Sequence, residues 1–211
     1  MPFELGRPLG MPDDAKFQKR VLLATLNLFE SKTGPLLKDF QEDAPVSGSA
    51  EVLWACPINL AGSPVDLSGM DALRDALKRE VRELRSWYDL AVKKRGRTTM
   101  GVSGLNMEEL VDFIGAFLDG IPKNPREDLL LAYTLNFAVD DLKAYYYEAA
   151  TAQPGGLSPA SSELDNWFWG ETVAAKVLFA VKSLCLKSDD KLLQFVGMIL
   201  LIPMAHTPIN A

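Results

Sequence analysis

Histidine is almost absent from this chain of 211 residues, which contains only His206. A catalytic triad of serine, histidine and aspartate must therefore use His206, which lies near the end of the sequence. Zinc sites built from several histidines are excluded, and so is a carboxylate di-iron centre that needs two Glu-x-x-His pairs. Acid–base chemistry, if there is any, falls to carboxylates, tyrosine, lysine or cysteine.

Cysteine is nearly as scarce, since the sequence contains only Cys56 and Cys185. Two cysteines so far apart form neither a disulfide framework nor a zinc pattern, and reduced thiols in a cytoplasm are the simplest interpretation. Cys56, in a predicted loop, is a candidate redox nucleophile. It has no second cysteine nearby to resolve a disulfide, however, and a buried structural thiol is the competing interpretation.

The sequence also lacks an excess of basic residues and a long apolar stretch. Lys and Arg number 22 against 28 Asp and Glu, which gives a net charge of −6 and argues against a nucleic-acid partner. The most apolar stretch, residues 192–205, is shorter than the ~20 residues that a membrane-spanning helix needs. We therefore expect neither a membrane span nor a signal peptide. The stretch is either a core helix or an exposed apolar face for a dimer or membrane contact.

Apolar residues recur with helical spacing over most of the sequence, and no strand-like alternation is present. The sequence predicts one all-α domain over residues 1–211 with about six or seven helices. Two of them, residues 125–152 and 161–187, are each predicted to be nearly 30 residues long. A short Pro-Gly linker joins these two, so we expect them to lie antiparallel. An extended arm is predicted over residues 1–12 and an irregular loop over about 41–67.

Glu171 is the most unusual polar residue of the second long helix. It falls within the apolar stripe of residues 161–187. A carboxylate that faces a core is costly unless it is paired or protonated. We therefore expect Glu171 to be either part of a functional site or paired with a lysine, arginine or tyrosine of another helix.

The first long helix carries acids that face the same way. Asp141 and Glu148 are seven residues apart and share a helix face, with Tyr145 beside them. With Trp167 and Glu171 they predict an acidic and aromatic pocket for a small molecule, or for Mg²⁺ or Mn²⁺. The alternative is a purely structural, hydrogen-bonded set of carboxylates. No residue is assigned as a metal ligand, and no cofactor is identified.

One basic run, residues 93–99, precedes a glycine-rich segment and the start of a predicted helix. Such a loop can bind an anion through backbone amides and cations, which makes Arg95, Arg97, Thr98 and Ser103 candidates. It lacks the Gly-Lys-Ser/Thr of a Walker A loop. The alternative is that the cations offset the dipole at the C-terminal end of the preceding helix.

Four segments resemble a group of bacterial helical proteins, some of which are labelled glycine/sarcosine/betaine reductase selenoprotein B-like. These are residues 3–10 (FELGRPLG), 34–45 (GPLLKDFQEDAP), 101–104 (GVSG) and 167–171 (WFWGE). The resemblance implies a bacterial, cytoplasmic protein. The reductase component depends on a selenocysteine or redox-cysteine motif, which the isolated Cys56 does not provide, so the resemblance implies no catalytic residue.

Two functions follow as hypotheses. The first is a non-catalytic helical binding or accessory protein that forms a homodimer. The second is an enzyme or small-ligand or metal-binding protein that uses the acidic and aromatic pocket. Convergent carboxylates around an open cavity favour the second hypothesis, whereas carboxylates occupied by other protein groups favour the first.

Overall fold

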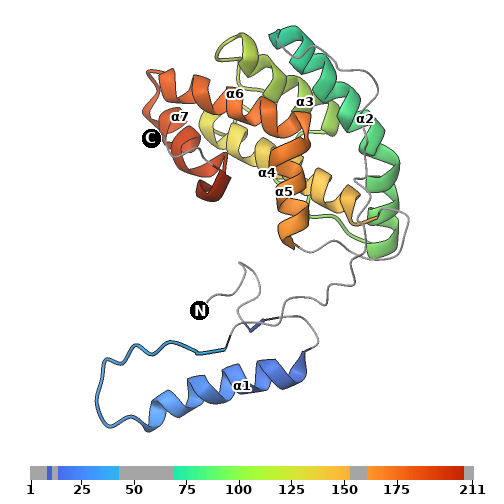
Figure 1. Cartoon of the computed structure of the whole chain (residues 1–211). Coiled ribbons are helices and arrows are strands. Elements are labelled where there is room, and N and C mark those ends of the chain that lie inside the picture. The colour runs from blue at the N-terminus through green and yellow to red at the C-terminus, as the bar shows by residue number, and fades with distance from the viewer. Residues whose placement is uncertain (1–8, 11–13, 43–68, 153–160, 207–211) are drawn as a thin grey trace. The chain divides into compact units, whose positions relative to one another are not determined.

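The computed structural model describes residues 9–10, 14–42, 69–152 and 161–206. All regular elements in these ranges are helical, which confirms the predicted all-α class (Figure 1). The α-helices are α1 (Ala15–Leu26), α2 (Met70–Arg95), α3 (Met107–Ala116), α4 (Leu131–Ala150), α5 (Ser161–Glu171), α6 (Val173–Lys187) and α7 (Lys191–Phe195). Shorter helical turns are η1 (Asn27–Glu30), η2 (Phe117–Asp119), η3 (Val196–Leu200) and η4 (Met204–His206).

The length of the chain predicts a single domain. The contacts within the chain divide it into two compact units, Met1–Leu53 and Trp54–Ala211. Each unit is described by itself. The arm predicted over residues 1–12 and the loop predicted over 41–67 lie almost entirely outside the described residues. A search of the described helices for a membrane-crossing candidate finds none of sufficient length and apolarity.

In the first unit, α1 begins where the Asp14 side chain accepts a hydrogen bond from the Phe17 amide, 3.0 Å away. Phe17 and Val21 are buried, and the ring of Phe40 packs edge-on against Phe17 with 5.9 Å between centroids. The segment after η1 therefore folds back along α1, and an ion pair between Arg20 and Glu42 joins the same two stretches.

In the second unit, α4 is the central helix. It contacts α2, α3, α5, α7 and η3 (Figure 1), and it buries side chains on more than one face. Small residues such as Ala138 and Ala149 are fully buried, which lets neighbouring helices approach closely. Because α4 is surrounded, any polar side chain on it must find a partner inside the protein.

Both long helices are shorter than predicted, so that part of the prediction was wrong. The first begins only at Leu131, because the preceding residues form turns rather than helix. The second is interrupted at Thr172 and becomes α5 and α6. The Thr172 hydroxyl accepts a hydrogen bond from the Ala175 amide at 3.1 Å, so Thr172 caps α6 as a new helix. Apolar periodicity continues across the break and conceals it.

Candidate functional site

The Asp141 carboxylate, on α4, is fully buried and accepts four hydrogen bonds from one loop. Its Oδ1 accepts from the amides of Gly101 at 2.7 Å and Val102 at 3.0 Å. Its Oδ2 accepts from the Ser103 amide at 2.9 Å and from the Ser103 hydroxyl at 2.5 Å. Both oxygens are therefore occupied by protein donors.

The Glu148 carboxylate, two turns further along α4, is bound by the start of the same loop. Its Oε1 accepts from the amide and the hydroxyl of Thr99, each at 2.7 Å, and its Oε2 accepts from the Thr98 hydroxyl at 2.8 Å. Burial raises the pKa of Glu148, but these hydrogen bonds and the charge of Arg95 outweigh it, so the pKa lies below its ordinary value.

The backbone of this loop is shaped to present its amides. Gly101 has a φ of 126° and Gly104 a φ of 71°, values that side chains rarely tolerate. Successive amides then point to one side and form an anion-binding concavity. Arg126 fixes the far end, since its Nη1 donates to the Ser103 carbonyl at 2.5 Å.

Two predictions thus meet at one place. The loop predicted to bind an external anion does bind anions, but they are Asp141 and Glu148 of the same chain. Thr98 and Ser103, two of the candidate anion-binding residues, donate to these carboxylates. Of the predicted cations, Arg95 donates to the Thr151 hydroxyl at 2.6 Å, and Arg97 is exposed.

The remaining members of the predicted pocket are Tyr145, Trp167 and Glu171. Tyr145 is buried, and its hydroxyl donates to the Val81 carbonyl at 2.7 Å. Trp167 is buried beside Tyr146, with 6.2 Å between ring centroids. Glu171 is exposed, so the prediction that it faces the core was wrong. Glu171 is the last residue of α5, and the apolar residues that follow it in the predicted stripe belong to the separate helix α6.

Replacing Glu148 with glutamine should lower the free energy of unfolding by about 1–2 kcal/mol at pH 7. The glutamine NH₂ group would replace one carboxylate oxygen and would face an N–H or O–H group of Thr98 or Thr99, which also donates. The wild-type pKa is depressed, so its contribution is present above the ordinary value of 4.5 and is lost as pH falls through the folded-state pKa. Urea unfolding across that range should show the two proteins converging at low pH. Glu127→Gln, at an exposed site, is the control. A constant difference at all pH values would contradict the prediction.

Sequence reasoning missed a third buried carboxylate, Glu80 of α2. It is 1% exposed and accepts from the Tyr146 hydroxyl at 2.6 Å. It also accepts from the Val173 and Ala174 amides at 2.8 and 3.1 Å, the first amides of α6. Glu80 therefore occupies the N-terminus of a helix, where a negative charge is favoured. Its signal in the sequence is its position in the same buried stripe as Leu77.

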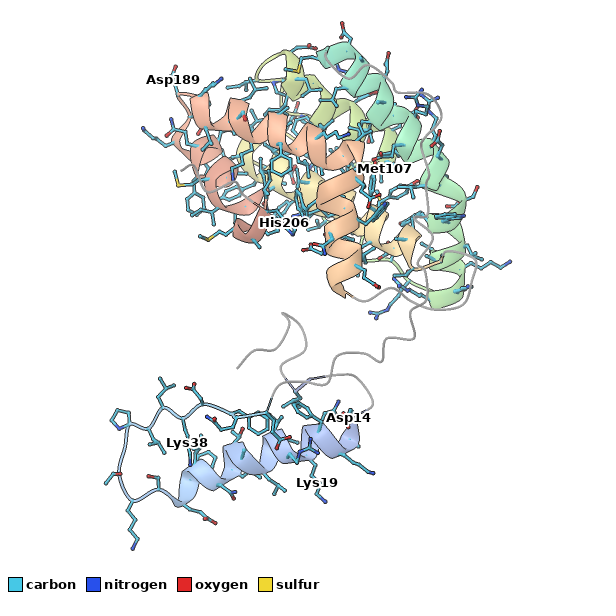
Figure 2. All side chains as sticks on the ribbon, in the orientation of Figure 1. Asp14, Lys19, Lys38, Met107, Asp189 and His206 are labelled. Atoms are coloured by element: carbon cyan, nitrogen blue, oxygen red, sulfur yellow. The ribbon has the colours of Figure 1, made fainter. Side chains whose placement is uncertain are left out.

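The single histidine also has an internal partner. The Nε2 of His206, labelled in Figure 2, lies 2.5 Å from the Asp165 Oδ2 of α5. The imidazole stacks on Trp169 with 5.6 Å between centroids, and the Tyr147 hydroxyl donates to the other Asp165 oxygen at 3.4 Å. This cluster attaches η4 to α4 and α5.

The described residues contain neither a candidate metal site nor a reactive thiol. These residues include no cluster of three or more His, Cys, Asp or Glu side chains that could hold a metal ion. Cys185 is buried, which raises the pKa of its thiol to about 11 and keeps it protonated at neutral pH. Cys56, the candidate redox nucleophile, lies outside the described residues.

Comparison with known proteins supplies no relative. No family model matches the chain, and no curated protein or solved structure matches it significantly.

Proposed function

We propose that this chain is a non-catalytic helical binding protein that acts as a homodimer. The occupied carboxylates support the first half of the proposal, because Asp141 and Glu148 accept hydrogen bonds from the loop at every oxygen. A general base or metal ligand needs a lone pair that faces the reacting atom or the ion. In this protein those lone pairs hold a loop in place.

The observation that carries the second half is an apolar face on α7, η3 and η4, which we call the C-terminal face. Five large apolar side chains on it are between 37% and 86% exposed: Phe195, Met198, Ile199, Leu200 and Met204. Leu193, Val196 and Leu201 of the same stretch are buried in the unit. The stretch therefore has one side in the core and the other exposed.

A second copy of the chain fits this face best. Residues 192–205 contain no charged side chain, whereas the whole chain carries a net charge of −6. A two-fold dimer places the same patch against itself, so a charged patch would meet like charges. An uncharged patch avoids that repulsion and buries apolar surface on both copies. A surface this apolar is typical of an association site.

Met198→Glu tests the dimer. Because it would bury a carboxylate without a partner at the centre of the contact, we expect it to weaken self-association by about thirtyfold or more, or ~2 kcal/mol. The full-length protein should sediment as a dimer and the variant as a monomer with the same helical content. Ile121→Glu, at an exposed apolar site outside the C-terminal face, should leave the dimer intact.

Three outcomes would contradict the proposed dimer. The first is a monomeric wild-type protein, and the second is equal dissociation by Ile121→Glu. The third is a dimer that survives Met198→Glu but dissociates with Leu26→Glu, since Leu26 is an exposed apolar residue of α1.

The proposal also covers the source of the protein, its compartment and the kind of partner it binds. The resemblance of four sequence segments to bacterial proteins supports a bacterial origin. The two cysteines of the sequence, without a disulfide framework, support a reducing cytoplasm. The acidic balance supports partners other than nucleic acid.

A further inference from the structure

A groove of about 370 Å³ lies between α2 and α3, and none of its lining residues belongs to the loop that Asp141 binds. Its volume is at the lower end of the range for small-molecule sites. Apolar atoms come from Val81 of α2, from Met107 (labelled in Figure 2) and Val111 of α3, and from the ring of Tyr145. Tyr145 keeps its hydroxyl on the Val81 carbonyl, so its ring is held in place. The groove therefore has an apolar lining of fixed shape.

The charged side chains of the groove are mostly neutralised within the protein. Lys78 Nζ lies 2.6 Å from an Asp112 oxygen, so these two lining groups cancel. Arg85 pairs with Asp89, one turn along α2, at 3.0 Å. Each pair is partly exposed and contributes little to stability, but each removes one cation from the set that a ligand would meet.

Two lining groups of opposite sign are left over. Within the part of the chain that the structure describes, neither the Arg82 guanidinium nor the Glu108 carboxylate is engaged by a hydrogen bond or ion pair. Arg82 comes from α2 and Glu108 from the first turn of α3, so the two helices each contribute one uncompensated charge to the groove. The groove thus offers one cation, one anion and an apolar lining.

We propose that this groove binds a small zwitterion with an apolar side chain, of the class of α-amino acids or short apolar peptides. Arg82 binds the carboxylate of the ligand, Glu108 binds its ammonium group, and the apolar lining covers its side chain. A simple anion would pair with Arg82 but would lie beside the like charge of Glu108. A simple cation would pair with Glu108 but would lie beside the like charge of Arg82. A single ligand with both charges satisfies both groups.

The inference names a ligand class for the proposed binding protein, and it rests on residues outside the C-terminal face. The two proposals therefore fail separately. Sedimentation reports on the dimer, whereas ligand titration reports on the groove, and Met198→Glu should leave titration unchanged.

Amide NMR titration of the full chain with L-leucine tests the groove. We expect saturable shifts at residues 78–85 and 107–112. N-acetyl-L-leucine lacks the cation and L-leucinamide lacks the anion, so each should bind about tenfold or more weakly, as the loss of one charge-assisted contact implies. Glycine, which has both charges but no side chain, should also bind more weakly.

Two variants make the assignment specific. Arg82→Met should reduce leucine to the affinity of leucinamide and leave leucinamide unchanged. Glu108→Gln should reduce leucine to the affinity of N-acetyl-leucine and leave that ligand unchanged. Arg79→Met and Glu83→Gln, at exposed sites on α2 outside the groove, are matched controls.

The proposal is overturned if leucine gives no saturable shifts in the groove. It is equally overturned if the two blocked ligands bind as well as leucine, or if the control variants weaken leucine as much as Arg82→Met and Glu108→Gln. All four substitutions are at exposed positions, so the variants should fold.

Discussion

Asp141→Ala is expected to lower the free energy of unfolding by about 3–5 kcal/mol, the largest loss among the substitutions considered. The change removes the acceptor for three backbone amides and one hydroxyl at once. The amide and hydroxyl of Ser103 are the most affected, because that residue is fully buried and water cannot replace the carboxylate. The loop should detach from α4 while α4 itself stays helical.

Urea unfolding followed by circular dichroism measures this effect. Asp140→Ala is the matched control, because Asp140 is the exposed neighbour on the same helix, where it pairs with Lys143 and accepts a long hydrogen bond from the Asn136 side chain at 3.4 Å. We expect it to change stability by less than about 0.5 kcal/mol. A loss for Asp141→Ala no larger than that of the control would show that the loop does not depend on this carboxylate.

Glu80→Ala should cost nearly as much, about 3–4 kcal/mol. The variant leaves the Tyr146 hydroxyl and the first two amides of α6 without their acceptor, and it opens a cavity where α2 packs against α6. Thermal or urea unfolding measures the loss, and Glu83→Ala at an exposed position of α2 is the control. A cost equal to that of the control would refute the role assigned to Glu80.

The pH dependence of Glu80 has the opposite sign to that of Glu148. Burial raises the pKa of Glu80 above its ordinary value of 4.5, although hydrogen bonds from Tyr146 and two amides act against the rise. A raised pKa means that the contribution is fully present below 4.5 and is lost as pH rises through the folded-state pKa. The neutral variant Glu80→Gln should therefore gain stability relative to the wild type as pH rises through that window.

The helical class of this protein is readable from its sequence, because apolar residues recur with helical spacing and the ends carry capping residues. The start of α3 is an example, since Asn106 and Glu109 form a reciprocal capping box. The end of α2 is another, at Gly96 with a φ of 67°. These signals are local, so a single sequence carries them.

The contacts of the carboxylates were not readable in the same way. That Asp141 and Glu148 share a helix face follows from their spacing, and so does the prospect of buried partners. Their partners include backbone amides some 40 to 50 residues away, such as those of Gly101 and Thr99. Backbone amides are present at almost every residue and leave no mark in the sequence. The break at Thr172 is hidden for a related reason. The first amides of α6 donate to Glu80, which lies about 90 residues earlier in the sequence.

Two carboxylates of α4 hold the loop through its amides, and the site has its present form only if they do. Hydrogen exchange measured by NMR at the amides of Thr99, Gly101, Val102 and Ser103 tests that claim directly. Thr99, Gly101 and Val102 are exposed residues, so an unbound loop would exchange them rapidly. The account predicts slow exchange at all four amides, comparable with the buried turns of α4. Exchange at the rate of an unprotected loop would contradict it.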